Sequence, residues 1–252
     1  MDESEVSALV LVGVTGDGKS STGNTLSGGS AFEVSAGLAS ATQESAHVDF
    51  MSMHDGEPAF FRVVDTIGLQ DTNLPAEEVM QRFSRFAHLT PFGIDAFLFV
   101  VRYGRFKPEH EAALSAFVAN CGDGALEHTI LLFTHCTLSN DDLTAALADS
   151  APPSLRDILP RLGGGVVAVE NVTEALAGRE RVLRCVAHMR SRNGSARYSN
   201  AALAKAQENY DAAKELERAA FASAVADWRK AGSGPVQIVR EHQACVRESR
   251  DA

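Results

Sequence analysis

The residues best suited to chemistry form one short run near the N-terminus, Gly13-Val14-Thr15-Gly16-Asp17-Gly18-Lys19-Ser20. The run has the spacing G-x-x-x-x-G-K-S, which is typical of a phosphate-binding loop. Glycines let backbone amides turn toward one anion, and a helix that begins at the end of the loop adds the positive end of its dipole. We expect Lys19 to reach the β- and γ-phosphates of a nucleoside triphosphate and the Ser20 hydroxyl to bind Mg²⁺. The residues expected to contact the nucleotide here are Gly13, Thr15, Gly16, Asp17, Gly18, Lys19, Ser20 and Ser21.

The segments on both sides of this run are those that a phosphate-binding loop needs. Residues 8–12, Ala-Leu-Val-Leu-Val, are apolar and rich in branched side chains, as expected of a buried strand. Residues 21–26 can open a helix. Because strand, glycine loop and helix start occur in this order, the sequence predicts that the chain binds a nucleoside triphosphate.

A second motif, Asp65-Thr66-Ile67-Gly68, follows a strand expected at 59–64. An aspartate at the carboxyl end of a strand can hold Mg²⁺ through a water molecule, and Gly68 can bring its backbone N–H against the γ-phosphate. The pattern D-T-x-G alone is common in turns, but here it follows the phosphate loop by one strand, a turn and a second strand. The sequence therefore predicts Ser20 and Asp65 as Mg²⁺ ligands and Gly68 as part of the catalytic site.

The rest of the chain alternates between strands and helices. The short turn at 54–58 predicts an antiparallel hairpin of strands 48–53 and 59–64, whereas the alternation elsewhere favours parallel pairing. We expect a three-layer α/β P-loop domain whose six-stranded sheet is mostly parallel with one antiparallel strand, and whose ligands bind at the carboxyl ends of the strands. The other strands are expected at 94–101, 129–133 and 166–169, and the helices at 75–89, 108–121, 140–149, 154–162 and 174–190.

The character of the sequence changes near residue 191. We expect a nucleotide-binding domain over 1–191 and a C-terminal helical extension over 192–252. The segment 199–231 is rich in alanine and carries a loose apolar stripe at helical spacing. This stripe either packs back onto the domain or serves association with a partner or a second copy.

The composition excludes several classes of function. A formal net charge of -10 argues against general affinity for nucleic acid or anionic lipid, and no apolar run is long enough to span a bilayer. The four cysteines are scattered and the first residues do not resemble a signal peptide, so we expect a cytoplasmic protein; peripheral membrane association has no support in the sequence. Cys121 has no evident histidine partner, and the spacing of His128, His135 and Cys136 matches no familiar zinc site.

Taken together, the motifs resemble those of the AIG-type GTPases, called immunity-associated GTPases (GIMAPs) in vertebrates and related to septins and to chloroplast-import receptor GTPases. The resemblance covers roughly residues 8–190 and rests on residues 13–26, on 65–69 and on the box 95–106, Asp-Ala-Phe-Leu-Phe-Val-Val-Arg-Tyr-Gly-Arg-Phe. It implies a P-loop GTPase that binds GTP or GDP with Mg²⁺ and acts as a nucleotide-controlled switch. By the same resemblance, Thr42 matches the first-switch threonine that ligates Mg²⁺ in the catalytic site. Arg105 matches the arginine that some relatives insert into a neighbour's site in a nucleotide-dependent homodimer.

The motif that reads the base departs from the common T-x-x-D pattern, because this chain has Thr134-His135-Cys136-Thr137. An aspartate would accept two charge-assisted hydrogen bonds from guanine, and Thr137 cannot replace that carboxylate. His135 is similar to the histidine that meets the base in the import receptors, and Asn171 to the asparagine of the family's last base-contacting motif. We therefore expect guanine, with reduced affinity or selectivity against ATP.

The catalytic motif also departs from that of Ras-like enzymes. Leu69 stands where those enzymes have the glutamine that orients the attacking water, and Gln70 lies one residue further on. We expect slow hydrolysis that dimerisation across the nucleotide face accelerates. The alternative is a scaffold or interaction module that binds GTP or GDP with negligible hydrolysis.

Overall fold

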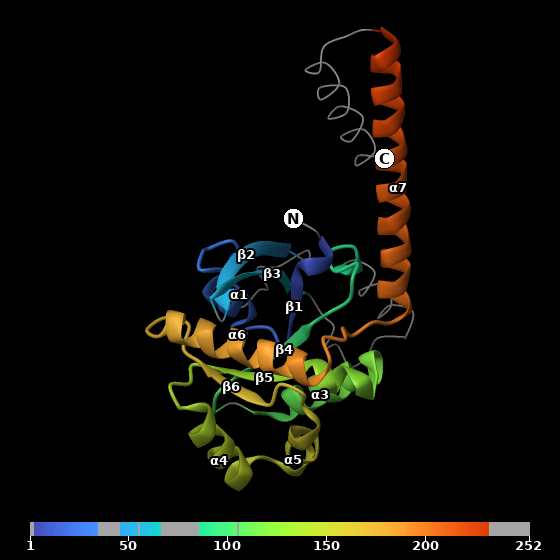
Figure 1. Ribbon diagram of the computed structural model, residues 1–252. Helices are drawn as coiled ribbons and strands as arrows, with labels where there is room; N and C mark the ends of the chain where they lie inside the picture. The colour runs from blue at the N-terminus through green and yellow to red at the C-terminus, as the bar shows by residue number, and fades with distance from the viewer. Residues whose placement is uncertain (1–2, 35–45, 55, 67–85, 105, 232–252) are drawn as a thin grey trace. The chain divides into compact units, whose positions relative to one another are not determined.

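The computed structural model describes residues 3–34, 46–54, 56–66, 86–104 and 106–231 (Figure 1). The chain divides into two compact units, Met1–Ala204 and Lys205–Ala252. The first unit contains the sheet and all the motifs discussed above. The helix expected at 75–89 falls mostly outside the described residues.

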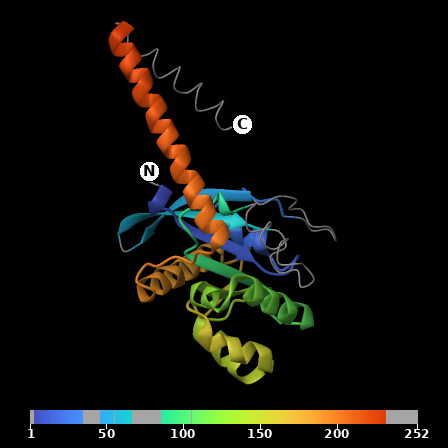
Figure 2. The same ribbon diagram turned by 90° about the vertical axis from the view of Figure 1, so that its right-hand side faces the viewer.

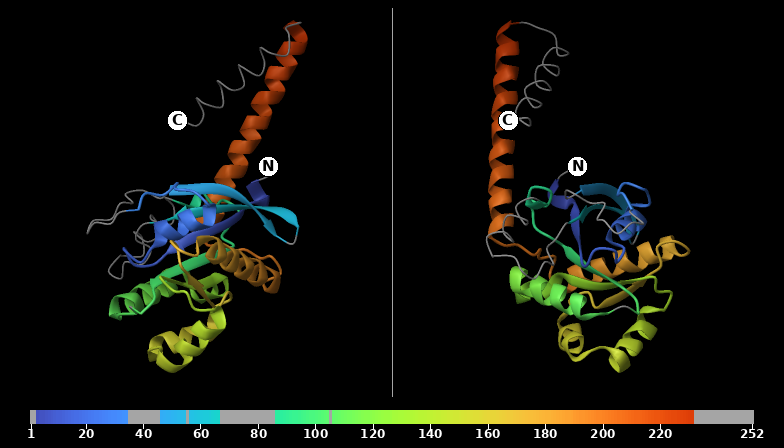
Figure 3. Two further views of the ribbon diagram at one scale, coloured as in Figure 1. Left: turned by 90° about the vertical axis from the view of Figure 1, so that its left-hand side faces the viewer. Right: turned by 180° about the vertical axis from the view of Figure 1, so that it is seen from behind.

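One six-stranded sheet forms the centre of the first unit, with the strand order β2-β3-β1-β4-β5-β6. Every neighbouring pair is parallel except β2 and β3, which form the predicted antiparallel hairpin. The mostly parallel α/β sheet with one antiparallel strand is thus confirmed, and β2 lies at its edge (Figure 3). The strands are β1 (Ser7–Val12), β2 (Ala46–His54), β3 (Glu57–Asp65), β4 (Ala96–Arg102), β5 (Thr129–Thr134) and β6 (Val166–Val169).

Helices cover both faces of this sheet, because its central strands are apolar at successive positions and buried on both sides. Leu26 of α1 (Lys19–Ser27) and Val182 of α6 (Ala175–Arg192) pack with alternate strand residues such as Leu98 on one face. Phe117 of α3 (Pro108–Cys121) packs edge-on against Phe97 and Phe99 on the other face, so α6 and α3 lie on either side of the central strands (Figure 2). The remaining helices of this unit are α4 (Asn140–Ser150) and α5 (Pro153–Ile158).

The segment after α6 is anchored in the first unit rather than forming a free connection. Ile94 and Tyr198 make an isolated antiparallel bridge, and the Tyr198 hydroxyl donates to the Cys121 carbonyl at 2.8 Å. Asp95 is fully buried and lies 2.9 Å from Arg190 and 3.2 Å from Arg197. The compact units divide at 204/205, and the boundary expected at 191/192 between the nucleotide-binding domain and the C-terminal extension stays a prediction.

The last helix, α7 (Ala201–Ala231), begins in the first unit and supplies the described part of the second. Its surface carries ion pairs between residues three apart, such as Lys205–Glu208 and Lys214–Glu217, and Leu216 is exposed. Within the described part of the chain, none of the helices combines the length and the apolar character needed to cross a membrane.

Candidate functional site

The phosphate loop connects β1 to α1 at the carboxyl edge of the sheet. Gly13 has φ 131°, and a Cβ at this position would collide with the backbone oxygen of Val100 on the neighbouring strand β4. Gly18 caps α1 with φ 98°, in the left-handed region. A Cβ on Gly18 would also press on Thr134 at 3.2 Å. Both glycines are therefore required by the backbone path that opens the loop toward an anion.

Lys19 lies over this loop. Its Nζ donates to the carbonyl oxygens of Gly13 at 2.8 Å and Val14 at 3.1 Å. Burial lowers the pKa of Lys19, and the carboxylates of Asp65 and Asp17 only partly oppose that shift. The site thus holds a partly buried ammonium whose charge an anion in the loop would balance.

Ser20 and Asp65 bring two oxygen ligands together at the start of α1 and the end of β3. The Ser20 hydroxyl donates to Asp65 Oδ2 at 2.6 Å. Asp65 Oδ1 is buried and has no hydrogen-bond partner among the described residues, and burial raises the pKa of this carboxyl group. Thr66 holds the motif beside β1, since its hydroxyl donates to the Leu11 carbonyl at 2.7 Å. A hydroxyl beside a carboxylate with one unused oxygen fits a hydrated Mg²⁺, which prefers oxygen ligands and keeps several waters.

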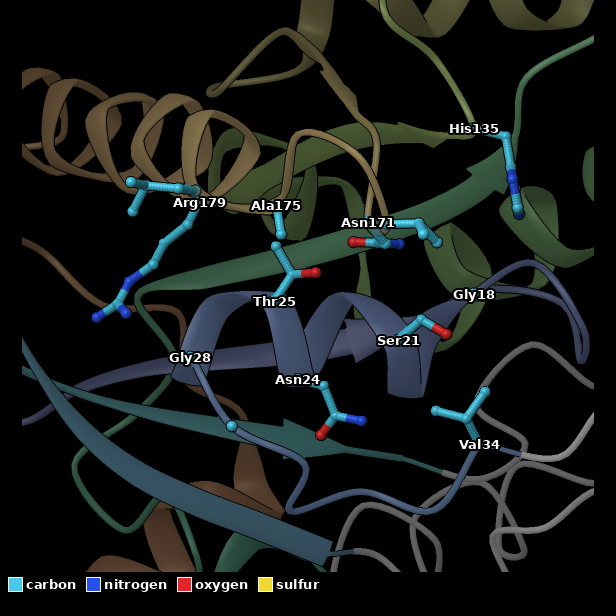
Figure 4. Close-up of a pocket in the computed structure, with 13 residues that line it drawn as sticks. Gly18, Ser21, Asn24, Thr25, Gly28, Val34, His135, Asn171, Ala175 and Arg179 are labelled. Atoms are coloured by element: carbon cyan, nitrogen blue, oxygen red, sulfur yellow. The ribbon is translucent and has the colours of Figure 1, made fainter.

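A cavity of about 450 Å³ extends from the phosphate loop along the outer face of α1 (Figure 4). Its volume is in the range of small-ligand pockets. His135, Asn171, Gly18 and Ser21 lie toward one end, and Gly28 with Arg179 toward the other. The structure therefore brings both residues expected to meet the base to the same cavity as the loop.

The two base-end residues have distinct environments. Asn171 Nδ2 donates to Thr22 Oγ1 at 3.2 Å, while its Oδ1 is buried without a partner among the described residues. His135 is exposed and has φ 52°, a backbone conformation that residues other than glycine rarely adopt. Such strain in a loop beside a cavity is common at ligand sites. Asn171, which lines the cavity, thus has a side-chain acceptor without a partner among the described residues, and its contact with a base stays a prediction.

Asn24 is a site residue that the sequence analysis missed. Its side-chain amide donates to the Phe32 carbonyl at 2.9 Å and accepts from the Phe32 amide at 2.9 Å, as a neighbouring strand would. The Phe32 ring packs where a side chain on Gly23 would lie, 2.7 Å from the position of its Cβ. This clamp fixes the path of the chain toward Val34, which lines the cavity.

The mouth of the cavity is apolar although it is open to solvent. Val34, Val172 and Leu176 line it and are 59%, 81% and 70% exposed. Single exposed apolar residues are ordinary, but three around one cavity mark a surface suited to a flat apolar ligand face.

The other predicted residues divide into two groups. Thr15 and Gly16 are exposed in the phosphate loop, whereas the Asp17 carboxylate is buried against His110 of α3, with 2.7 Å between Oδ2 and Nε2. The second group comprises the predicted catalytic residues Thr42, Gly68 and Arg105, which lie outside the described residues and stay predictions.

The alternative sites considered from the sequence gain no support. Among the residues that the structure describes, no three or more of His, Cys, Asp and Glu gather where they could hold a metal ion. Burial raises the pKa of Cys121 to about 12, so its thiol is protonated at neutral pH. Nucleophilic chemistry at this cysteine is therefore not favoured.

Comparisons with known proteins find a matching family model and several similar sequences. The model of the AIG1 family matches residues 7–217. Immune-associated nucleotide-binding protein 9 of Arabidopsis thaliana is 32% identical over 222 residues, which cover 83% of this chain and 64% of that protein. Immune-associated nucleotide-binding protein 8 of the same plant is 30% identical over 173 residues, with 67% and 48% covered. The chain thus spans less than two thirds of the length of these relatives.

One solved structure supports the fold alone. A dimerization-deficient mutant of Toc33 from Arabidopsis thaliana aligns with a TM-score of 0.54 at 20% sequence identity. The alignment covers 77% of this chain and 86% of that one.

Proposed function

Because this chain belongs to the AIG1 family, we propose that it binds GTP and GDP with Mg²⁺ and hydrolyses GTP slowly as a nucleotide-controlled switch. One observation carries the proposal. The phosphate loop with its partly buried Lys19, the Ser20–Asp65 oxygen pair and the Asn171 oxygen, which has no partner among the described residues, lie at one end of the sheet and its adjoining cavity. Together they match the polyphosphate, the metal ion and the base of one nucleotide.

Each part of the site has a role in the proposal. The loop amides and Lys19 hold the phosphates, Ser20 and Asp65 hold Mg²⁺, and His135 and Asn171 contact the base. A Mg²⁺ held by Ser20 and Asp65 would supply positive charge that offsets the negative charge of the phosphates during transfer. The proposal includes three further roles. Thr42 is a further protein ligand of Mg²⁺ beside the Ser20–Asp65 pair, Gly68 contacts the γ-phosphate through its backbone N–H, and Arg105 reaches the site of the second copy in a homodimer.

The choice of guanine is tested by competition against a fluorescent GTP analogue. The Asn171 oxygen and His135 favour guanine, whereas Thr137 supplies no carboxylate. We expect unlabelled GTP to displace the probe at a concentration only about tenfold lower than ATP, because His135 and Asn171 remain to contact the base while the charge-assisted bonds of a carboxylate, worth about 1.5–3 kcal/mol each, are absent. Equal displacement by ATP would contradict guanine recognition, and no binding of any purine nucleotide would contradict the whole proposal.

Hydrolysis and dimerisation are tested by phosphate release over a wide range of protein concentration. We expect turnover per molecule to rise with concentration and to fall in Arg105→Ala by about 10³-fold or more, the range that an arginine finger contributes. Arg161→Ala is the matched control, since Arg161 pairs with the exposed Asp123 on the surface. Turnover that stays flat and unaffected by Arg105→Ala argues against action across the dimer. No turnover at all favours the alternative, a GTP/GDP-binding interaction module in the cytoplasm.

A further inference from the structure

The phosphate loop contains an acid at a position where an acid is unfavourable. Asp17 directly precedes Gly18, and the Lys19 ammonium is close enough to lower the pKa of the Asp17 carboxyl. Lys19 is the charge proposed to hold the phosphates. An Asp17 carboxylate that faced the same space as the Lys19 ammonium would therefore repel those phosphates.

The carboxylate is instead buried against α3. Asp17 Oδ2 lies 2.7 Å from His110 Nε2, and the two side chains are 10% and 2% exposed. Gly18 and Ser21 line the cavity, whereas Asp17 does not. The Asp17 side chain thus points toward α3 and not into the cavity.

The second nitrogen of the histidine fixes the direction of this hydrogen bond. The backbone N–H of Lys107 donates to His110 Nδ1 at 3.0 Å, so that nitrogen carries no proton. The proton of the neutral ring is therefore on Nε2 and is donated to Asp17. The Phe106 ring stacks on the imidazole with 5.7 Å between centroids, which holds the ring in this orientation.

Other contacts keep the backbone of Asp17 in place independently of His110. The Thr134 hydroxyl donates to the Asp17 carbonyl at 2.7 Å, and the Asp17 amide donates to Val14. Burial raises the pKa of Asp17, nearby Glu109 adds to that rise, and His110 opposes it. Loss of the histidine would thus leave the loop path largely intact but remove the group that makes a buried carboxylate tolerable.

We infer that His110 is a positioning residue for the phosphate loop, which holds the Asp17 carboxylate away from the bound phosphates and so makes an acidic loop compatible with a nucleoside triphosphate. The inference rests on the proposed function.

Two substitutions separate this role from the hydrogen bond that His110 accepts from the Lys107 amide at the start of α3. In H110N, the side-chain oxygen can still accept from the Lys107 amide, but the side chain is too short to reach Asp17. In H110Q, the amide nitrogen can still donate to Asp17, while the contact with Lys107 is lost. With mant-GTP and saturating Mg²⁺, we expect H110N to bind about tenfold more weakly than the parent and H110Q to stay within about threefold.

The same pair is then measured in a D17N background, which removes the charge but keeps the size of the side chain. In that background we expect H110N to weaken mant-GTP binding by less than about threefold, because no carboxylate remains that could be released toward the phosphates. Melting of the nucleotide-free variants shows whether each one is folded. H110Q weaker than H110N, no loss in either, or a tenfold loss that persists in the D17N background would each overturn the inference. A parent that binds no nucleotide would instead remove the proposed function, and the two failures are thereby distinguished.

Discussion

Replacing Lys19 with alanine is expected to weaken GTP and GDP binding by about 10²–10⁴-fold. The ammonium is held over the loop by the carbonyl oxygens of Gly13 and Val14, so it is positioned before any ligand arrives. Hydrogen bonds to charged groups are worth about 1.5–3 kcal/mol each, and two such bonds to phosphate oxygens correspond to this loss. Titration calorimetry with saturating Mg²⁺ measures it directly.

The fold is not expected to suffer from this substitution. The lowered pKa of Lys19 means that burial disfavours its charged form in the folded protein, so the ammonium costs stability at neutral pH rather than adding to it. The nucleotide-free variant should therefore melt no lower than the parent. Lys205→Ala is the control, because Lys205 forms an exposed ion pair with Glu208. Parent-like nucleotide binding by Lys19→Ala would contradict the assignment of the loop.

The sequence was informative wherever the chemistry lies in one continuous run. The phosphate loop is contiguous, and its glycines, lysine and serine can be identified by spacing alone. The position of Asp65 beside Ser20 could also be predicted, because a short hairpin leads to it and because the apolar strand before it ends at the carboxyl side of the sheet, where the loop lies. The fold followed from the same alternation of apolar strands and amphipathic helices, and its one antiparallel pair from a short turn.

Two kinds of contact could not be predicted from the sequence. Some join residues that lie far apart in the chain, and in another a side-chain amide pairs with the backbone. His110 and Asp17 are 93 positions apart, and a histidine at the start of a helix carries no sign of its partner. Asn24 lies in the run that carried the family resemblance, but only the fold shows that its amide pairs with the backbone of Phe32. The extension expected after residue 191 contains Arg197, whose role depends on meeting the buried Asp95.

Replacing Asp65 with asparagine is expected to remove the effect of Mg²⁺ on nucleotide binding. In the native site Oδ2 accepts from Ser20 and the buried Oδ1 has no partner among the described residues, so one oxygen is free to accept from the water shell of a cation. In the variant the remaining oxygen can keep the Ser20 contact, which places an NH₂ group where that acceptor was. A donor there opposes the ion, and the charge that attracts it is gone.

The measurement is the affinity for mant-GTP with Mg²⁺ and with EDTA. We expect Mg²⁺ to strengthen binding by the parent and to change binding by Asp65→Asn less than about twofold, a difference of about 10²-fold when the lost charge-assisted contacts are worth about 3 kcal/mol. Asp123→Asn is the control, because Asp123 is 76% exposed in its pair with Arg161. Ser20→Ala should lose the effect of Mg²⁺ on mant-GTP binding to the same extent, and the double variant should bind little more weakly than either single variant, since both side chains serve one ion. An additive loss, or a parent-like response to Mg²⁺ in Asp65→Asn, would show that the cation is held elsewhere and that the Ser20–Asp65 pair only joins α1 to β3.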